Sequence, residues 1–267
     1  MTALRTALLQ GPAGVPESVA HSVEVLAEAA GRAAERGARL LVTSEMFVTG
    51  YALGAAGAAR AAEPADGPTA ERIAGIAARH GIAIAYGWPE RAGDDVFNTV
   101  RLVGPDGAVL ADYRKTHLYG PYEREAFTPG DTTVVQATLD GVRLGLLICY
   151  DVEFPEPVRA HALAGTELLL VPTALMRPQE FVPLTLVPTR AYENGLYIAY
   201  VNRCGPEGEW DFAGLSCLAG PDGIARVRAG AGAELLVADV DPALTRTVRA
   251  ANPYLTDRRP ELYRALG

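Results

Sequence analysis

The sequence predicts a single α/β domain in which mixed β-sheets are covered by helices. Short apolar runs alternate with longer segments whose apolar residues recur at helical spacing, a pattern that gives βαβ units. Two Gly-Pro-Asp-Gly turns each join a pair of short strand-like runs, which adds antiparallel hairpins. No Gly/Ser-rich linker interrupts the 267 residues, so we expect one domain over residues 1–267.

The first half of the chain supplies three strands, two helices and a hairpin. The strands are predicted at residues 4–10, 39–43 and 82–86. The helices are predicted over the Ala-rich segments 16–36 and 69–80. The hairpin joins residues 98–103 to residues 108–113 through the first Gly-Pro-Asp-Gly turn.

The second half repeats the alternation and ends in a basic tail. Strands are predicted at residues 142–148, 168–171, 197–202 and 234–240, with the second hairpin around residues 220–223. Helices are predicted at residues 155–164 and at 179–194, the latter broken near Pro183 and Pro188. The Arg-rich segment 241–267 contains Pro253 and Pro260, and we expect it to contribute to a subunit interface.

Composition narrows the functional class. The net charge of −8 and the absence of a Lys/Arg-rich block argue against a nucleic-acid partner or an acidic membrane surface. No apolar run approaches the roughly 18 residues of a membrane-spanning helix, and the N-terminal stretch becomes polar too soon for a signal peptide. Three cysteines without CxxC spacing exclude a disulfide framework and a zinc ribbon. We therefore expect a cytoplasmic protein in a reducing compartment.

Three predicted strands end in residues that can do chemistry. Glu45 follows residues 39–43, Lys115 follows residues 108–113, and Cys149 follows the apolar run of GLLICYD. Each residue alone has a structural alternative: a helix-start charge, a solvated surface lysine and a small core residue. Because ligands of open α/β sheets bind outside the carboxyl ends of strands, the three together favour one shared pocket.

A cysteine nucleophile needs a base to remove its proton. His117 is only two residues from Lys115, so a Cys–His pair remains possible. Glu45 is the alternative base, although moving a proton from Cys to Glu costs roughly 5.7 kcal/mol at reference pKa values. Burial would raise the pKa of Glu45, and the Lys115 ammonium would lower that of the thiol. Lys115 and the backbone N–H of Tyr150 are candidate donors to the oxyanion of an attacked carbonyl.

Three motifs in this order resemble those of the nitrilase superfamily of carbon–nitrogen hydrolases. They are SEMFVTGY around Glu45, YRKTHLYG around Lys115 and GLLICYDVEFPE around Cys149. The resemblance spans nearly the whole chain and includes AFTPG, LVPTA, RAYEN, FAGLS and PYLTDRRPELY. YGWPER, YRKTHLYG and CYDVEFPE are most similar to the aliphatic amidase branch typified by 5-aminopentanamidase.

The resemblance implies a four-layer α-β-β-α sandwich in a homodimer or larger homo-oligomer. It implies a Glu45–Lys115–Cys149 triad that acts through a thioester, with no metal and no organic cofactor. It also places a second glutamate at Glu123, with Glu125 as the less favoured candidate. The structural alternative for both glutamates is a solvated loop charge.

Departures from the family pattern bear on the substrate. Ser44 stands where the family usually has proline, which affects only local stiffness. In PTALMRP, Leu175 stands where relatives often have a small residue or asparagine, at a position that borders the substrate pocket. We expect Tyr51, Ala174 and Leu175 to line that pocket, with Leu175 narrowing it or favouring an apolar substrate.

The function that these residues imply is hydrolysis of a small aliphatic amide to a carboxylic acid and ammonia. An N-carbamoyl amine or amino acid hydrolase and a nitrilase would use the same triad. A non-catalytic member of the family that binds a partner protein is an alternative of another class, which the intact Glu45, Lys115 and Cys149 argue against.

Overall fold

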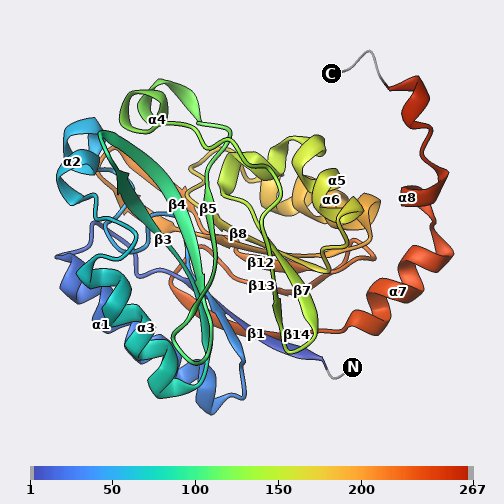
Figure 1. Ribbon diagram of the computed structural model, residues 1–267, viewed down its shortest axis with the longest axis horizontal. Helices are drawn as coiled ribbons and strands as arrows, with labels where there is room; N and C mark the ends of the chain where they lie inside the picture. Colours follow the sequence, from blue (N-terminus) through green and yellow to red (C-terminus); the bar gives the residue numbers. More distant parts are fainter. Residues whose placement is uncertain (1–2, 264–267) are drawn as a thin grey trace.

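Two six-stranded sheets pack face to face, with helices on both outer faces (Figure 1). The computed structural model describes residues 3–263. The arrangement is the four-layer α-β-β-α sandwich that the resemblance implied, and the prediction of mixed sheets covered by helices is confirmed. Within residues 3–263, no helix is both long enough and apolar enough to cross a membrane.

The first sheet is built mainly from the N-terminal half of the chain. Its pairs β1–β2 and β2–β3 are parallel and its other pairs are antiparallel. Residues alternate between the two faces, so Leu8 packs toward the second sheet and Leu9 packs under the helices α1 (Val19–Glu35) and α3 (Pro68–His80). The strand order is β14 (Glu234–Val240), β1 (Leu4–Gln10), β2 (Leu40–Val42), β3 (Ala83–Ala92), β4 (Asp95–Val103) and β5 (Val109–Arg114).

The second sheet comes from the C-terminal half. Helices α5 (Pro155–Leu163) and α6 (Val187–Asn194) cover its outer face (Figure 1). The predicted break near Pro183 is a π-helical turn, η2 (Val182–Leu186), that leads directly into α6. The strand order is β13 (Ala225–Arg228), β12 (Cys217–Ala219), β9 (Tyr197–Asn202), β8 (Leu168–Thr173), β7 (Val142–Leu146) and β6 (Gln136–Leu139).

Several elements were not predicted from the sequence. The strand expected to end at Tyr86 continues as β3 to Ala92, and a two-residue Gly93-Asp94 turn pairs it with β4. Gly93 has φ +64°, as such tight hairpins require. The other unpredicted elements include strand β6, the short helices α2 (Gly54–Ala61) and α4 (Gly120–Ala126) and the ribbon of β10 (Cys204–Glu207) with β11 (Trp210–Ala213). α2 and α4 lie at one end of the sandwich (Figure 1).

The C-terminal segment runs along the outer side of the second sheet as α7 (Pro242–Ala251), α8 (Tyr254–Asp257) and η3 (Pro260–Leu262) (Figure 1). Arg249 fixes α7 by donating to the carbonyls of Thr166 and Gly195 at 2.8 and 2.9 Å. The start of this segment is therefore held by contacts within its own chain. Its predicted contact with a partner subunit stays a prediction, and residues 264–267 of the predicted tail lie outside the described part.

Candidate active site

Glu45 lies in the loop that follows β2, at the junction of the two sheets. Its N–H donates to the carbonyl of Thr173 at the end of β8, at 3.3 Å. Gly87 of β3 lies directly against this loop, because a methyl group at Gly87 would be only 2.7 Å from the nitrogen of Met46. The Glu45 side chain is buried at 1% exposure, and Asn98 donates to its Oε1 at 2.6 Å.

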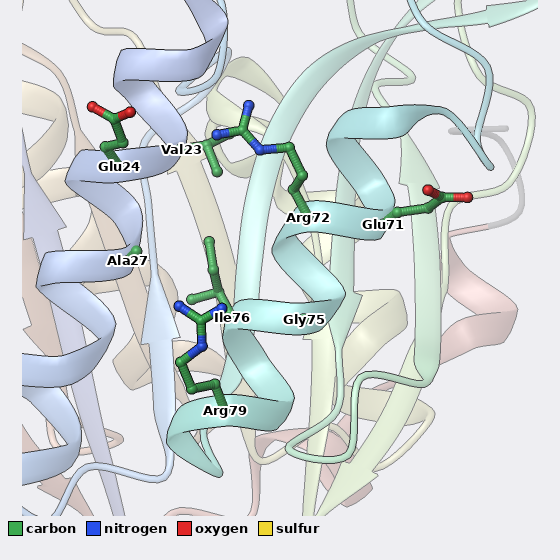
Figure 2. Close-up of a pocket in the computed structure, with 8 residues that line it drawn as sticks. All are labelled: Val23, Glu24, Ala27, Glu71, Arg72, Gly75, Ile76 and Arg79. Carbon is green, nitrogen blue, oxygen red and sulfur yellow. The ribbon is translucent and has the colours of Figure 1, made fainter.

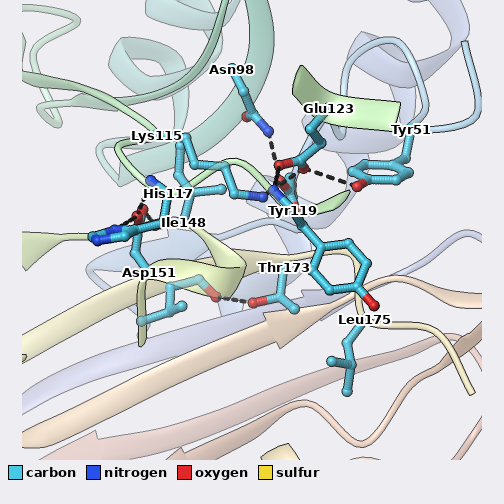
Figure 3. A network of polar contacts seen from close by, with 12 residues as sticks. Tyr51, Asn98, Lys115, His117, Tyr119, Glu123, Ile148, Asp151, Thr173 and Leu175 are labelled. Atoms are coloured by element: carbon cyan, nitrogen blue, oxygen red, sulfur yellow. Dashed lines mark hydrogen bonds and ion pairs between the residues drawn. The ribbon is translucent and has the colours of Figure 1, made fainter. Parts of the chain in front are cut away.

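Lys115 follows β5 and its ammonium lies between two carboxylates (Figure 3). Its Nζ is 2.8 Å from Oε1 of Glu45 and 2.6 Å from Oε1 of Glu123. All three side chains are fully buried. The backbone of Lys115 is held on both sides, because its N–H donates to Asn98 and its carbonyl accepts from Gly130, each at 2.8 Å.

Glu123 comes from the short helix α4 and is completely buried. Its Oε1 also accepts from the hydroxyl of Tyr51 at 2.9 Å, and its Oε2 accepts from the N–H of Tyr119 at 2.6 Å (Figure 3). The alternative of a solvated loop charge is therefore wrong for Glu123. Glu125 is exposed on the same helix, which agrees with its lower rank as a candidate.

Cys149 begins the 3₁₀ turn η1 (Cys149–Glu153) that follows β7. Its φ is +47°, a left-handed conformation that costs a non-glycine residue about 1–3 kcal/mol. Its side chain is 8% exposed. Such strain persists only where the surrounding structure holds it.

The buried cluster sets the pKa of Glu45. Burial raises the pKa of Glu45 to about 7, although the Lys115 ammonium opposes the shift. Burial also disfavours the charged form of Lys115, but Glu123 and Glu45 outweigh this effect and raise the pKa of Lys115 well above its usual range. At neutral pH the lysine is charged, while Glu45 is close to its titration midpoint.

The surroundings of Cys149 favour the protonated thiol. Burial and the charge of Glu45 raise the pKa of Cys149 well above its usual range. Lys115 lowers that pKa, in the predicted direction, and a hydrogen bond from the backbone of Ala174 acts the same way. The predicted effect of Lys115 is therefore confirmed, but burial outweighs it and the net pKa of the thiol is raised.

The residues predicted to line the substrate pocket are all buried beside these groups. Tyr51 and Ala174 belong to one apolar cluster with Met46, Met176 and Phe212. Leu175 is 3% exposed in the large core cluster that includes Cys149, and Asn202 binds both its N–H and its carbonyl. The ring of Tyr150 packs edge-on against Tyr119 and Phe154.

His117, the candidate for a Cys–His pair, is engaged elsewhere. Its Nδ1 lies 2.8 Å from Oδ1 of Asp151, and its ring stacks on Phe154. The charged groups that act on Cys149 are instead Glu45, Lys115 and Glu123. The structure therefore favours the carboxylate as the base.

Asn98 is a site residue that sequence reasoning missed. It interrupts the apolar alternation of β4, and it binds both the Glu45 side chain and the Lys115 backbone. Arg203 and Glu207 were missed as well. This buried ion pair anchors the loop that carries Glu45, because Oε1 of Glu207 accepts from the N–H groups of Tyr51 and Ala52.

A groove of about 430 Å³ is lined by residues that include His117 and Tyr150. Other grooves in the described part of the chain contain none of the predicted site residues. One of about 340 Å³ lies between α1 and α3 and is lined by residues that include Arg72 and Arg79 (Figure 2). Residues 3–263 hold no group of three or more His, Cys, Asp and Glu side chains arranged to bind a metal ion.

The model of the carbon–nitrogen hydrolase family matches residues 5–250 of the chain. A Pseudomonas protegens protein named "hydrolase in pqqF 5'region" is 46% identical over 97% of this chain and 90% of its own length. An (R)-stereoselective amidase from Pseudomonas sp is 39% identical over 82% of this chain and 79% of its own length.

Solved structures agree with these relatives. A Nesterenkonia sp. amidase has a TM-score of 0.89 and 42% identity, covering 99% of this chain and 96% of its own. A glutamate-to-glutamine variant of a Nesterenkonia sp. AN1 amidase carries the acetamide moiety of fluoroacetamide on its active-site cysteine. That structure has a TM-score of 0.84 and 39% identity, covering 98% of this chain and 96% of its own.

The chain thus belongs to the carbon–nitrogen hydrolase family, within the nitrilase superfamily. It is an enzyme of the amidase type that hydrolyses carbon–nitrogen bonds.

The close approach of Gly87 to the Glu45 loop gives a first test. In Gly87→Ala the added methyl group must push the backbone of Met46, because it would lie 2.7 Å from that nitrogen. We expect kcat for amide hydrolysis to fall by roughly 10- to 100-fold as Glu45 moves by a fraction of an ångström. Gly75→Ala on α3 is the control, since a methyl group there meets nothing within 4 Å. Equal activity of the two variants would contradict the account.

Proposed function

We propose that the protein hydrolyses a small aliphatic amide to a carboxylic acid and ammonia through a thioester on Cys149. One observation carries the proposal. Oε1 of Glu45 accepts from both Lys115 and Asn98, whereas its buried Oε2 has no hydrogen-bond partner among residues 3–263. A buried carboxylate oxygen without a hydrogen-bond partner destabilises the fold, so its presence calls for an explanation. Accepting a proton from the thiol would satisfy this oxygen.

In the first step, Sγ of Cys149 attacks the amide carbonyl while Oε2 of Glu45 takes the thiol proton. The ammonium of Lys115 has three N–H donors, of which Glu45 and Glu123 occupy two. The third donor and the N–H of Tyr150 bind the oxyanion of the tetrahedral intermediate. Glu45 then gives its proton to the nitrogen, and ammonia leaves the thioester.

In the second step, water attacks the thioester carbonyl and restores the thiol. Glu45 removes the proton of the water and returns it to sulfur as the acid is released. Oε1 of Glu123 accepts from Lys115 and Tyr51. Among residues 3–263 its Oε2 accepts only from Tyr119, so this oxygen keeps one acceptor position. Glu123 can therefore orient the attacking water as well as hold Lys115.

The surroundings of the triad favour a neutral substrate with a small apolar acyl group. The cluster beside Glu123 is built from Tyr51, Ala174, Met176 and Phe212, all buried and uncharged. The (R)-stereoselective amidase and the Nesterenkonia amidases among the relatives support amides as the substrate class. N-carbamoylputrescine amidases and nitrilases are also related to this chain, so carbamoyl compounds and nitriles are the competing substrates.

A panel of short amides, N-carbamoyl compounds and nitriles, assayed for ammonia and carbon dioxide, tests this function. Acid and ammonia from an amide support it, whereas carbon dioxide identifies a carbamoyl substrate. Cys149→Ala should abolish turnover and keep the far-UV circular dichroism of the wild type. Wild-type turnover by Cys149→Ala would overturn the thioester mechanism, and inactivity of the wild type on the whole panel would favour a non-catalytic role.

The raised pKa of Glu45 predicts the pH dependence of the reaction. Because the carboxylate is the reactive form and its pKa is about 7, acidification below pH 7 should lower kcat/KM by about tenfold per pH unit. The charge of Glu123 contributes to raising this pKa, so Glu123→Gln should move the acidic limb to lower pH. The assignment would be contradicted if kcat/KM of the wild type declined only near the ordinary glutamate pKa. It would also be contradicted if Glu123→Gln left the pH of this decline unchanged.

We further propose that residues 1–267 form one domain and that residues 241–267 contribute to a homodimer interface. Apolar side chains are exposed along the outer side of the second sheet, including Leu163, Phe181 and Leu262 at 51%, 65% and 62% exposure. Light scattering should give about twice the 28.2 kDa chain mass. Leu163→Asp and Phe181→Asp should lower that mass, and a monomeric wild-type protein would refute the interface.

A further inference from the structure

Asp151, two residues after Cys149, has no part in the proposed reaction, yet its carboxylate accepts several hydrogen bonds. Its side chain is fully buried. Oδ2 accepts from the N–H of Ile148 at 3.1 Å and from the hydroxyl of Tyr113 at 2.9 Å. Oδ1 accepts from the hydroxyl of Thr116 and the N–H of His117, both at 2.9 Å, and lies 2.8 Å from Nδ1 of His117 (Figure 3).

These partners belong to two segments that are far apart in the sequence. Ile148 immediately precedes the nucleophile, whereas Thr116 and His117 immediately follow Lys115. The carboxylate thus joins the turn that carries the thiol to the segment that carries the ammonium. Neither Cys149 nor Lys115 is itself bonded to Asp151 among the interactions of residues 3–263, so its effect on them is indirect.

The chemistry of the site requires a carboxylate. A backbone N–H can only donate, and one such donor faces each oxygen of Asp151, from Ile148 and from His117. An asparagine amide has a single acceptor atom, so its NH₂ group would face one of these N–H groups. The hydroxyls of Tyr113 and Thr116 could rotate to accept instead, but the two backbone groups cannot.

We propose that Asp151 is a positioning residue that fixes the distance between the Cys149 thiol and the Lys115 ammonium. The inference rests on the proposed function, because that distance matters only if both groups act on one carbonyl. Cys149 holds a strained φ of +47°, which must be imposed by its neighbours. The bond from Ile148 to Asp151 imposes it on one side, and the bonds from Thr116 and His117 anchor the same carboxylate to the lysine segment.

The deciding variant is Asp151→Asn, which keeps the shape of the side chain. We expect kcat for the best amide of the panel to fall by roughly 100-fold while KM changes less than about threefold, because alignment is lost and binding is retained. Iodoacetamide should still alkylate Cys149, since the thiol remains present.

Glu63→Gln is the matched control for loss of a hydrogen-bonded carboxylate. Glu63 caps α3 by accepting from the N–H and the hydroxyl of Thr69, at 3.0 and 2.8 Å, and it is not part of the proposed site. Glu63→Gln should lower the Tm and keep kcat within about twofold of the wild type. A wild-type kcat in Asp151→Asn, a change confined to KM, or an equal loss in Glu63→Gln would overturn the proposal.

Two further variants decide the matter if Asp151→Asn does not fold. Tyr113→Phe and Thr116→Val each remove one hydroxyl that donates to Asp151, and both leave the hydrogen bonds from the N–H groups of Ile148 and His117 in place. Each should lower kcat several-fold at constant KM, and unchanged kcat in both folded variants would refute the inference. Failure of the proposed function is a distinct result, because the wild type would then be inactive on the whole panel or Cys149→Ala would retain activity.

Discussion

One buried ammonium held between two buried carboxylates is the constraint on which the site depends. Glu45, Lys115 and Glu123 are all withdrawn from water, which costs several kcal/mol per ion unless each charge is paired and hydrogen-bonded. A single lysine serves two carboxylates, so the cluster carries one uncompensated negative charge when all three groups are ionised. Burial is the main reason that the pKa of Glu45 is raised to about 7, and the charge of Glu123 adds to it against the opposing effect of Lys115. The electrostatic penalty of the cluster and the basicity of Glu45 are therefore the same effect.

The two-sheet architecture provides the hydrogen bonds that this cluster needs. Glu45 follows a strand of the first sheet, yet its N–H binds Thr173 at the tip of a strand of the second sheet. Asn98 joins Glu45 to Lys115 by using its side chain for one residue and its backbone carbonyl for the other. The geometry of the triad thus depends on the packing of the two sheets, and apolar burial far from the site helps to determine its distances.

The sequence predicted the parts of the site that local pattern encodes. Glu45, Lys115 and Cys149 could be found because each follows an apolar run, and most strands were placed correctly for the same reason. Glu123 came from a family resemblance, since its short helix has no apolar period of its own. Asn98 and the bonds of Asp151 to Tyr113 and Thr116 could not be found, because their partners are 17 to 53 residues away along the chain. The lowering effect of Lys115 on the thiol pKa was predicted, but the larger opposing effect of burial was not, because burial depends on the complete fold.

A protonated thiol beside a carboxylate of pKa about 7 implies that proton transfer accompanies attack on the carbonyl. A Cys–His enzyme can hold a thiolate before its substrate arrives, but here burial makes a standing thiolate unfavourable. In the proposed mechanism, sulfur becomes nucleophilic only when a carbonyl oxygen is placed to receive charge near Lys115, since that charge compensates the loss of the proton. Reactivity is thereby coupled to substrate geometry, and small errors in the spacing of Cys149 and Lys115 translate directly into lost rate.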